Sequence, residues 1–384
     1  MKHISIKEIQ NIQIIGLGLI GTSIGFALKK NGYAVTGYDI DPERTITANE
    51  IGAIDTVGLN LSADVTFIAV PVAKIVPIAK IILMQDIAYD DAFASLIEQR
   101  DAAKGDLNPQ MILTDVAGIK APIVAEIDHP YFIGGHPMAG SERLGPLGAD
   151  PKLFVGASWV LTPTGSTNQD AFTALSALIR QMDAEVVSLE PDRHDRLVAT
   201  VSHVPHLIAA NLMLLAQEQS FTEAALLRLA AGGFRDMTRI SAGDPEIWPD
   251  VLLNNGEEVM ATLESLVERL DAVRLLIAER NRSDLYDLLQ RAQKARRNLP
   301  QRALASDELV EVAIMIPDKP GVLAEITTCL GSEGINLYNL EIVHSGEFAN
   351  GILIMVIDRT DVTRTENLLS AKGYALNIKE SYDR

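Results

Sequence analysis

A glycine-rich turn between a predicted strand and a predicted helix limits the fold of this chain more than any other feature. The apolar run IQII leads directly into GLGLIG at residues 16–21, and a helix is predicted from Thr22 to Lys30. In a G-x-G-x-x-G turn the first glycine permits a tight bend, the second lets a pyrophosphate approach the backbone, and the third lets helix and strand pack closely. The motif alone is a weak signal. It predicts the following dinucleotide contacts: Gly16, Gly18, Leu19, Ile20 and Gly21.

The second predicted strand, AVTGYD, strengthens this interpretation because it ends in Asp39. An acidic residue about 20 positions after the glycines binds the adenosine ribose hydroxyls in this type of fold. Its charge would repel a 2′-phosphate, so NAD is favoured over NADP. Val70 and Pro71 end the next predicted strand and are expected to line the same cleft, although a proline there could simply end the strand.

Short apolar runs alternate with helical patterns from Ile12 to about Leu189. Each run is apolar on both faces and is bounded by Gly, Pro or Asp, as buried strands of a parallel sheet are. The runs are IQIIGLG, AVTGYD, VTFIAVP, MILTD, YFIGG and SWVLTPT. We therefore predict an α/β fold for residues 10–190, with a Rossmann-type doubly wound parallel sheet.

Residues 191–298 have almost no strand signal and repeat apolar residues at spacings of three and four, which predicts an all-α domain. One helical face carries Val259, Leu263, Leu266, Leu270, Val273 and Leu276. Such a stripe is more often core or dimer seam than a cofactor site. A polar linker is predicted at residues 299–308, and residues 309–384 follow in the order βαββαβ, the ferredoxin-like arrangement.

Charge and composition narrow the class of partner and the compartment. The chain has 33 Lys and Arg against 51 Asp and Glu, a net charge of -18, which disfavours nucleic acid as a partner. Its single cysteine, Cys329, suits a reducing cytoplasm. We find no signal peptide and no apolar stretch near the roughly 20 residues that a transmembrane helix needs, so we expect a cytoplasmic protein without a membrane partner.

His136 is the candidate catalytic base. Removing a hydride from an alcohol carbon requires a group that takes the hydroxyl proton, and histidine suits that role near neutral pH. His136 lies in GGHPMAGSE and follows a strand predicted to end at the cofactor side of the sheet, where ligands bind in this fold. A histidine between glycines and a proline is poorly suited to core packing, although a structural role is the alternative.

Two further histidines, His203 and His206, stand three apart in SHVPH and are expected to share a helical face. Paired histidines can bind zinc, but no nearby Cys, Asp or Glu completes a site at the usual spacing, so we expect no metal. A structural pair is the other possibility. Arg239, in a glycine-rich segment, could present a planar fork to a carboxylate, or could be a solvated surface residue.

The motifs GLGLIG, GGHPMAGSE, SHVPHLIA and GGFRDMTRISAGDPEIW occur here in the order that they have in the prephenate dehydrogenase family, which the chain resembles over roughly residues 10–298. The resemblance implies oxidative decarboxylation of prephenate to 4-hydroxyphenylpyruvate with reduction of NAD, in tyrosine biosynthesis. It also implies a homodimer that associates through the helical domain. Prephenate carries two carboxylates and a ring hydroxyl, so it needs cationic or hydrogen-bonding anchors and one base.

The same resemblance implies roles for individual residues. The histidine matching His136 hydrogen-bonds the ring hydroxyl and assists hydride transfer, and the arginine matching Arg239 binds a substrate carboxylate. Residues matching His203 and His206 lie at the substrate pocket, and the tryptophan matching Trp248 lies near the subunit boundary.

One loop departs from the family pattern. Many members carry a loop of the type D-x-G-S-x-K. Its serine, two residues before the lysine, contacts the ring hydroxyl together with the histidine. Here Gly118 occupies that position, two residues before Lys120. The hydroxyl contact is therefore missing, or is made by Thr114, by Ser141 or by water.

Residues 309 to about 380 resemble an ACT domain, a βαββαβ module that binds amino acids between copies. The resemblance rests on IPDKPGVL at 316–323 and on GIN at 334–336. It makes Asp318, Gly321 and Asn336 candidate effector-binding residues, because glycine permits close approach of the backbone and the asparagine amide can bind a polar group. Attached to an enzyme that makes a tyrosine precursor, the module is expected to bind tyrosine and to lower activity.

Three other functions stay open at this point. Arogenate dehydrogenase carries out the same reaction on the amino analogue of prephenate, and the sequence does not separate the two substrates. A β-hydroxyacid dehydrogenase shares the layout of a Rossmann domain followed by helices, but the GGHP and SHxPH motifs argue against it. A non-catalytic amino-acid sensor is disfavoured because His136 and the glycines of the turn are all present.

Overall fold

The computed structural model describes residues 6–84, 91–102, 107–141, 143–223, 225–297, 309–317, 319–337, 339–344, 350–374 and 376–379. Contacts between Cα atoms divide the chain into two compact units, Met1–Leu299 and Pro300–Arg384. The boundary predicted near residue 190, between a sheet domain and a helical domain, falls inside the first unit. The predicted linker lies outside the described residues.

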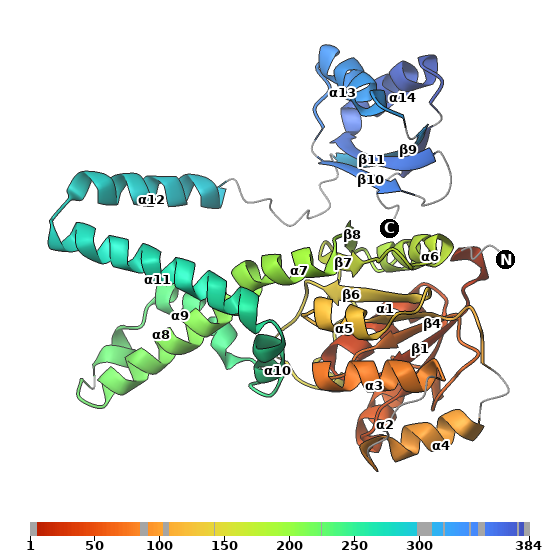
Figure 1. Ribbon diagram of the computed structural model, residues 1–384, viewed down its shortest axis with the longest axis horizontal. Coiled ribbons are helices and arrows are strands. Elements are labelled where there is room, and N and C mark those ends of the chain that lie inside the picture. The colour runs from red at the N-terminus through yellow and green to blue at the C-terminus, as the bar shows by residue number, and fades with distance from the viewer. Residues whose placement is uncertain are drawn as a thin grey trace. The chain divides into compact units, whose positions relative to one another are not determined.

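An eight-stranded sheet forms the centre of the first unit, in the order β3-β2-β1-β4-β5-β6-β7-β8 (Figure 1). Six of these strands lie on the predicted apolar runs, whereas β3 and β8 were not predicted. Their bounds are Asn11–Ile15 (β1), Ala34–Tyr38 (β2), Thr56–Val57 (β3), Val65–Ile68 (β4), Ile112–Asp115 (β5), Phe132–Pro137 (β6), Ser158–Thr162 (β7) and Glu185–Ser188 (β8).

The sheet is of the predicted Rossmann type, but one pair of strands departs from the predicted parallel direction. β6 and β7 pair antiparallel, with His136 opposite Val160, while the other neighbouring strands are parallel. A parallel pair needs a crossover connection, usually a helix. The described residues between β6 and β7 contain only the short 3-10 helix Pro146–Gly148, so the chain reverses instead of crossing over.

Strand register brings the residues that follow several strands to one edge of this sheet. Ile15 pairs with both Tyr38 and Ile68, and Ile68 pairs with Asp115. The glycine turn and the segments after β2, β4 and β5 therefore begin at the same edge, and β6, parallel to β5, carries His136 toward it.

Helices cover the faces of the sheet because their apolar residues pack on the buried strands. Ile75, Ile78 and Ile82 of α3 share a core with Ile68 and Leu113 of the sheet. Val251 of α10 joins the same core, which attaches the helical region to the sheet. The helices before residue 190 are α1 (Leu19–Lys30), α2 (Pro42–Glu50), α3 (Val72–Ile82), α4 (Ala94–Ala102), α5 (Ala121–Glu126) and α6 (Gln169–Arg180).

All described regular structure after β8 in the first unit is helical, as predicted. Between α7 and α8 the chain forms a π-helical segment, Ala199–His203, a conformation that is rare and often found at functional sites. Its helices are α7 (Pro191–Val198), α8 (Val204–Ser220), α9 (Gly232–Thr238), α10 (Ile247–Asn254), α11 (Gly256–Ala278) and α12 (Arg282–Arg297). Figure 1 shows α11 leading away from the sheet and α12 turning back from its far end.

The predicted apolar stripe divides into two parts on α11. At its start, Val259 is buried, and Leu263 and Leu266 pack with residues of α8. Farther along, Leu270 is 58% exposed. The stripe therefore belongs to the core of this chain only over the first half of the helix.

One helical stretch, Pro191–Ser220, is long and apolar enough to cross a membrane, and only 28% of its most apolar window is buried. The expectation that no stretch approaches this length is therefore wrong on length and composition. The sequence analysis missed it because polar residues and histidines precede the apolar part. Core helices pass the same test, so the finding is weak evidence for a membrane segment.

The second unit is a four-stranded antiparallel sheet in the order β10-β11-β9-β12. Ile326 and Leu330 of α13 and Leu369 of α14 pack on the sheet in one apolar core. The elements occur in the order β9 (Leu309–Pro317), α13 (Val322–Ser332), β10 (Asn339–His344), β11 (Asn350–Asp358), α14 (Val362–Ala371) and β12 (Leu376–Lys379).

Candidate active site

The glycine turn has the geometry that a dinucleotide-binding turn requires. Gly16 has a φ of +94°, and a Cβ there would lie 2.3 Å from the Ala69 carbonyl oxygen. A Cβ on Gly21 would lie 2.0 Å from the Gly16 carbonyl oxygen, so this position needs glycine for the helix to pack on the strand. Around Gly18, by contrast, nothing lies within 4 Å of a Cβ. Backbone atoms therefore pack closely against the first and third glycines, while the space next to the second glycine is free for the approach of a pyrophosphate.

Asp39 is held next to this turn. Its Oδ2 accepts a hydrogen bond from the Leu17 amide at 2.7 Å, and its Oδ1 accepts one from the Asp41 amide at 2.9 Å. The side chain is half-buried, at the carboxyl end of β2. The backbone thus fixes the carboxylate at the place where an adenosine ribose would lie, and these residues fit NAD.

The remaining predicted cofactor contacts lie around the same edge. Leu19 and Ile20 are partly exposed in the first turn of α1. Val70 touches the turn, since its Cγ1 lies 2.8 Å from the Cβ position of Gly16. Pro71 is exposed and caps the N-terminus of α3.

His136 is the penultimate residue of β6, inside the strand rather than after it. A buried ion pair holds the preceding residue on both sides: Asp115 Oδ1 accepts from the Gly135 amide at 3.1 Å, and Lys120 Nζ donates to the Gly135 carbonyl at 2.7 Å. Asp115 and Lys120 also hydrogen-bond each other, and both are fully buried. Burial lowers the pKa of Lys120, and Asp115 opposes that shift. The end of β6 is thereby fixed.

A chain of hydrogen bonds links His136 to His194 and then to Asp195, at the start of the helical region. His136 Nδ1 lies 2.8 Å from His194 Nε2, and His194 Nδ1 lies 2.7 Å from Asp195 Oδ1. His194 and Asp195 are both buried. The sequence analysis missed these two residues, and their only signal was an adjacent His-Asp pair in an otherwise charged helix.

His203 enters the site from the π-helical segment. Its Nδ1 lies 3.1 Å from Asn255 Nδ2, which also donates to the Asp195 carbonyl oxygen at 2.8 Å. The ring additionally hydrogen-bonds the backbone of Gly118. Burial lowers the pKa of His203 to about 4, although Asp195 opposes the shift.

The backbone at Gly118 separates two histidine rings. A Cβ at this position would lie 3.8 Å from His136 Nε2 and 3.9 Å from His203 Nε2. The two ring nitrogens therefore face the same small volume, which a side chain at residue 118 would occupy without a clash. Burial, reinforced by His194, Lys120 and His203, holds the pKa of His136 well below its ordinary value. At neutral pH the ring is uncharged and able to accept a proton.

His206 lies against Trp248, which His203 also contacts. Its ring stacks on the indole of Trp248, and His203 meets the same indole edge-on. Burial lowers the pKa of His206. Four of the seven histidines in the sequence thus gather around Gly118 and Trp248.

The other predicted substrate contacts, Arg239 and Ser141, have exposed side chains. Arg239 begins a 3-10 helix, Arg239–Ala242, which packs against α8, and its side chain is exposed. Ser141 is exposed, its Oγ accepts from the Arg143 amide at 3.3 Å, and among the described residues it makes no hydrogen bond to His136. Thr114 is fully buried, and its hydroxyl donates to the Asp115 carbonyl at 3.3 Å. A contact of either hydroxyl with the substrate stays a prediction.

No cluster of three His, Cys, Asp or Glu side chains suited to a metal ion occurs within the described residues. Of the predicted effector residues, Gly321 has a φ of +93° and precedes α13, and Asn336 is exposed before β10. Asp318 lies outside the described residues.

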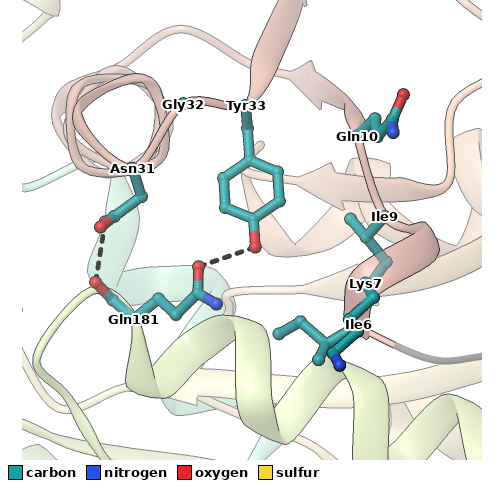
Figure 2. Close-up of a pocket in the computed structure, with 8 residues that line it drawn as sticks. All are labelled: Ile6, Lys7, Ile9, Gln10, Asn31, Gly32, Tyr33 and Gln181. Carbon is teal, nitrogen blue, oxygen red and sulfur yellow. Dashed lines mark hydrogen bonds between the residues drawn. The ribbon is translucent and has the colours of Figure 1, made fainter.

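A separate pocket of about 310 Å³ lies elsewhere on the first unit (Figure 2). Tyr33 donates to Gln181 Oε1 at 2.7 Å, and Asn31 Nδ2 donates to the Gln181 carbonyl at 2.8 Å. The pocket is lined by Ile6, Lys7, Ile9, Gln10, Asn31, Gly32, Tyr33 and Gln181. It shares no residue with the histidine cluster or the glycine turn.

Comparison with known proteins gives matches over most of the chain. The model for the nucleotide-binding domain of prephenate dehydrogenase matches residues 24–90 and 96–188, and the model for its dimerization domain matches residues 190–291. The prephenate dehydrogenase of Bacillus subtilis (strain 168) is 32% identical over 371 residues, which cover 94% of this chain and 96% of that protein.

Solved structures agree with the sequence matches. The prephenate dehydrogenase of Aquifex aeolicus, in complex with hydroxyphenyl propionate and NAD+, has a TM-score of 0.66 at 28% identity and covers 78% of this chain and 100% of its own. Synechocystis arogenate dehydrogenase has a TM-score of 0.61 at 28% identity, with coverages of 76% and 100%.

Proposed function

This chain belongs to the prephenate dehydrogenase family and is an NAD-dependent oxidoreductase, and on that premise we propose that it converts prephenate to 4-hydroxyphenylpyruvate in tyrosine biosynthesis. The observation that carries the proposal is the position of His136. Its Nε2 faces the open volume beside Gly118, at the sheet edge that also bears the glycine turn. A neutral base therefore lies at the same edge of the sheet as the proposed NAD site.

The chain's own groups account for the proton. His136 Nε2 takes the proton of the ring hydroxyl as the carbon-oxygen double bond forms. NAD, when bound, accepts the hydride from the same carbon. The electron pair of the breaking bond to the ring carboxylate then moves through the ring onto the oxygen of the new ketone, and CO₂ leaves. The resulting phenolate oxygen takes back the proton from His136, and aromatisation makes the loss of CO₂ essentially irreversible.

Substrate binding needs positive charge, which the histidines do not supply at neutral pH because burial lowers the pKa of His203 and of His206. We assign carboxylate binding to Arg239, whose guanidinium can form two parallel hydrogen bonds. His203 acts as a neutral wall of the pocket, and His206 acts as a neutral wall and hydrogen-bonding group.

Arogenate is the second candidate substrate, because a solved relative of similar likeness is an arogenate dehydrogenase. The test is the rise in NADH absorbance when purified protein and NAD are mixed with prephenate or with arogenate. A higher kcat/KM for prephenate is expected. A higher value for arogenate would reassign the substrate, and no NADH with either would refute the proposal.

We further propose that the protein is a homodimer formed by its helical region, which matches the family's dimerization domain. Exposed apolar side chains support this interface, among them Val267, Leu270, Leu275 and Ile277 of α11. Burial against a second copy would remove them from water. Such an interface also explains the low burial of the apolar stretch Pro191–Ser220 without a membrane, in keeping with a cytoplasmic enzyme.

The second unit is proposed to be an ACT domain that binds tyrosine and lowers activity. Its element order and its strand order are those of a ferredoxin-like module, and Gly321 takes the left-handed conformation before α13. Truncation after about residue 298 tests the proposal. The truncated enzyme should stay active and lose tyrosine inhibition, whereas unchanged inhibition that competes with prephenate would place tyrosine at the catalytic pocket.

A further inference from the structure

The contacts of Asp195 determine which nitrogen of His194 carries a proton. Asp195 Oδ1 accepts from the Lys120 amide at 2.7 Å, and Oδ2 accepts from the Ala121 amide at 2.8 Å. A carboxylate held by two amides acts as an acceptor, so His194 Nδ1 must donate the hydrogen bond to Oδ1. In a neutral His194, Nε2 then carries the lone pair.

The same reasoning passes from His194 to His136. Because His194 Nε2 is an acceptor, the 2.8 Å contact requires His136 Nδ1 to donate. The lone pair of His136 therefore lies on Nε2, which faces the space beside Gly118. His203 does not compete for that lone pair, since Asn255 donates to its Nδ1 and its other nitrogen bonds the backbone of Gly118.

We propose that His194, oriented by Asp195, is a positioning residue that keeps His136 in the tautomer with an unprotonated Nε2, the form required of a base; this rests on the function proposed above. When Nε2 takes the hydroxyl proton, the imidazolium keeps its Nδ1–H hydrogen bond to His194. Asp195 stabilises the positive charge through the same line of contacts. His194 itself does not touch the substrate.

The charged groups around His136 and His194 allow two protonation states of this pair. Lys120 and His203 are the other titratable groups that face His136, and Asp195 is the acidic partner of His194. If His194 were a stable imidazolium, it would donate to His136 Nδ1, and His136 would then carry its proton on Nε2. The two arrangements place the His136 proton on different nitrogens.

Nuclear magnetic resonance on the full chain, labelled with ¹⁵N-histidine and free of NAD, shows whether the proton of His136 lies on Nδ1 or on Nε2. The signals lost in His136→Asn identify the His136 ring. The proposal expects Nδ1 protonated and Nε2 bare at neutral pH. Protonation of Nε2 in the wild-type chain would overturn it, whatever the enzyme's activity, so this measurement stays decisive if a variant fails to fold.

Kinetics with prephenate and NAD give the second test. His194→Phe, which removes both hydrogen bonds, should lower kcat about 10- to 100-fold with KM changed less than about threefold. His194→Gln keeps an acceptor at the same distance along the side chain and should recover part of kcat. His129→Gln is the matched control, because His129 accepts from the Tyr131 amide in another part of the unit.

The outcomes separate the two proposals. Unchanged kcat in His194→Phe, or no recovery in a folded His194→Gln, overturns the positioning role. A wild-type chain that makes no NADH from prephenate refutes the proposed function, while the ring protonation still decides the role of His194.

Discussion

The ring of His206 lies flat on the indole of Trp248, with centroids 3.6 Å apart and planes 14° from parallel. The same indole meets His203 edge-on at 6.3 Å. One side chain of α10 thus orients two histidines that flank the start of α8. Because the indole is only partly buried, it also offers its remaining surface to a ligand or a second subunit.

Trp248→Ala should raise KM for prephenate more than it lowers kcat, since both histidines lose a wall that fixes their orientation. The loss of aromatic contact is expected to cost about 1 kcal/mol of binding. Trp248→Phe keeps a stacking surface and serves as the control. Steady-state kinetics at several substrate concentrations measure both constants. A smaller effect of alanine than of phenylalanine would contradict the stacking role.

His136→Asn should lower kcat by about 10² to 10⁴, the usual contribution of a positioned acid or base, with less change in substrate binding. His203→Asn is the comparison, because His203 lies beside the same volume without a free ring nitrogen. If His203→Asn loses more kcat than His136→Asn, the two residues exchange roles.

Arg239→Ala should raise KM most, by about 2 kcal/mol or more of binding free energy if the carboxylate is desolvated in the complex. Arg239→Lys should recover only part, because an ammonium group cannot form the bidentate pair. Kinetics with both variants, together with binding of 4-hydroxyphenylpyruvate followed by calorimetry, check this. A fall in kcat at unchanged KM would show that Arg239 does not bind a substrate carboxylate.

Asp39→Asn combined with Ile40→Arg should shift preference from NAD toward NADP. Asparagine keeps an acceptor for the Leu17 amide but loses the charge that repels a 2′-phosphate, and Ile40, which is 68% exposed, has room for an arginine. The ratio of kcat/KM for the two cofactors is the measurement. A wild-type enzyme that already prefers NADP would show that the ribose assignment is wrong.

Acid should destabilise the first unit through His203. Its pKa of about 4 in the folded chain lies below the ordinary value of about 6.5. Above pH 6.5 the residue has no effect, and the free energy of unfolding should fall between pH 6.5 and 4 by on the order of 2 kcal/mol after solvent screening. Urea unfolding followed by fluorescence reports on this unit, because both tryptophans, Trp159 and Trp248, lie in it. His203→Gln should weaken the pH dependence, and an equally steep dependence in this variant would contradict the assignment.

The conformation of the glycine turn could be predicted because it is local: Gly16 and Gly21 follow β1 closely, and Asp39 directly follows β2. It did not predict His194, since the contact with His136 spans 58 residues and forms only after β7, β8 and α7 have folded. β3 and β8 were not predicted because both strands are short and have exposed ends. The antiparallel direction of β7 depends on the absence of a crossover helix, which strand patterns alone do not reveal.

His136 and His203, both predicted to lie at the substrate site, lie on either side of the Cβ position of Gly118. His203 ends the π-helical segment and His206 lies in α8, and both rings contact the indole of Trp248, which agrees with the expected common face. Roles for these residues stay predictions until the variants are measured.

The π-helical segment Ala199–His203 takes up one residue more than a regular α-helix would between α7 and α8. A π turn holds one residue more than an α turn, and each residue of an α-helix turns the chain by about 100°. Deleting Thr200 would let the segment relax to a regular α-helix, in which four residues make about the same rotation as the five π-helical residues make now, so His203 should keep its direction relative to α7. A deletion within α7, where no wider turn can take it up, would instead turn His203 away from Gly118 by about 100°.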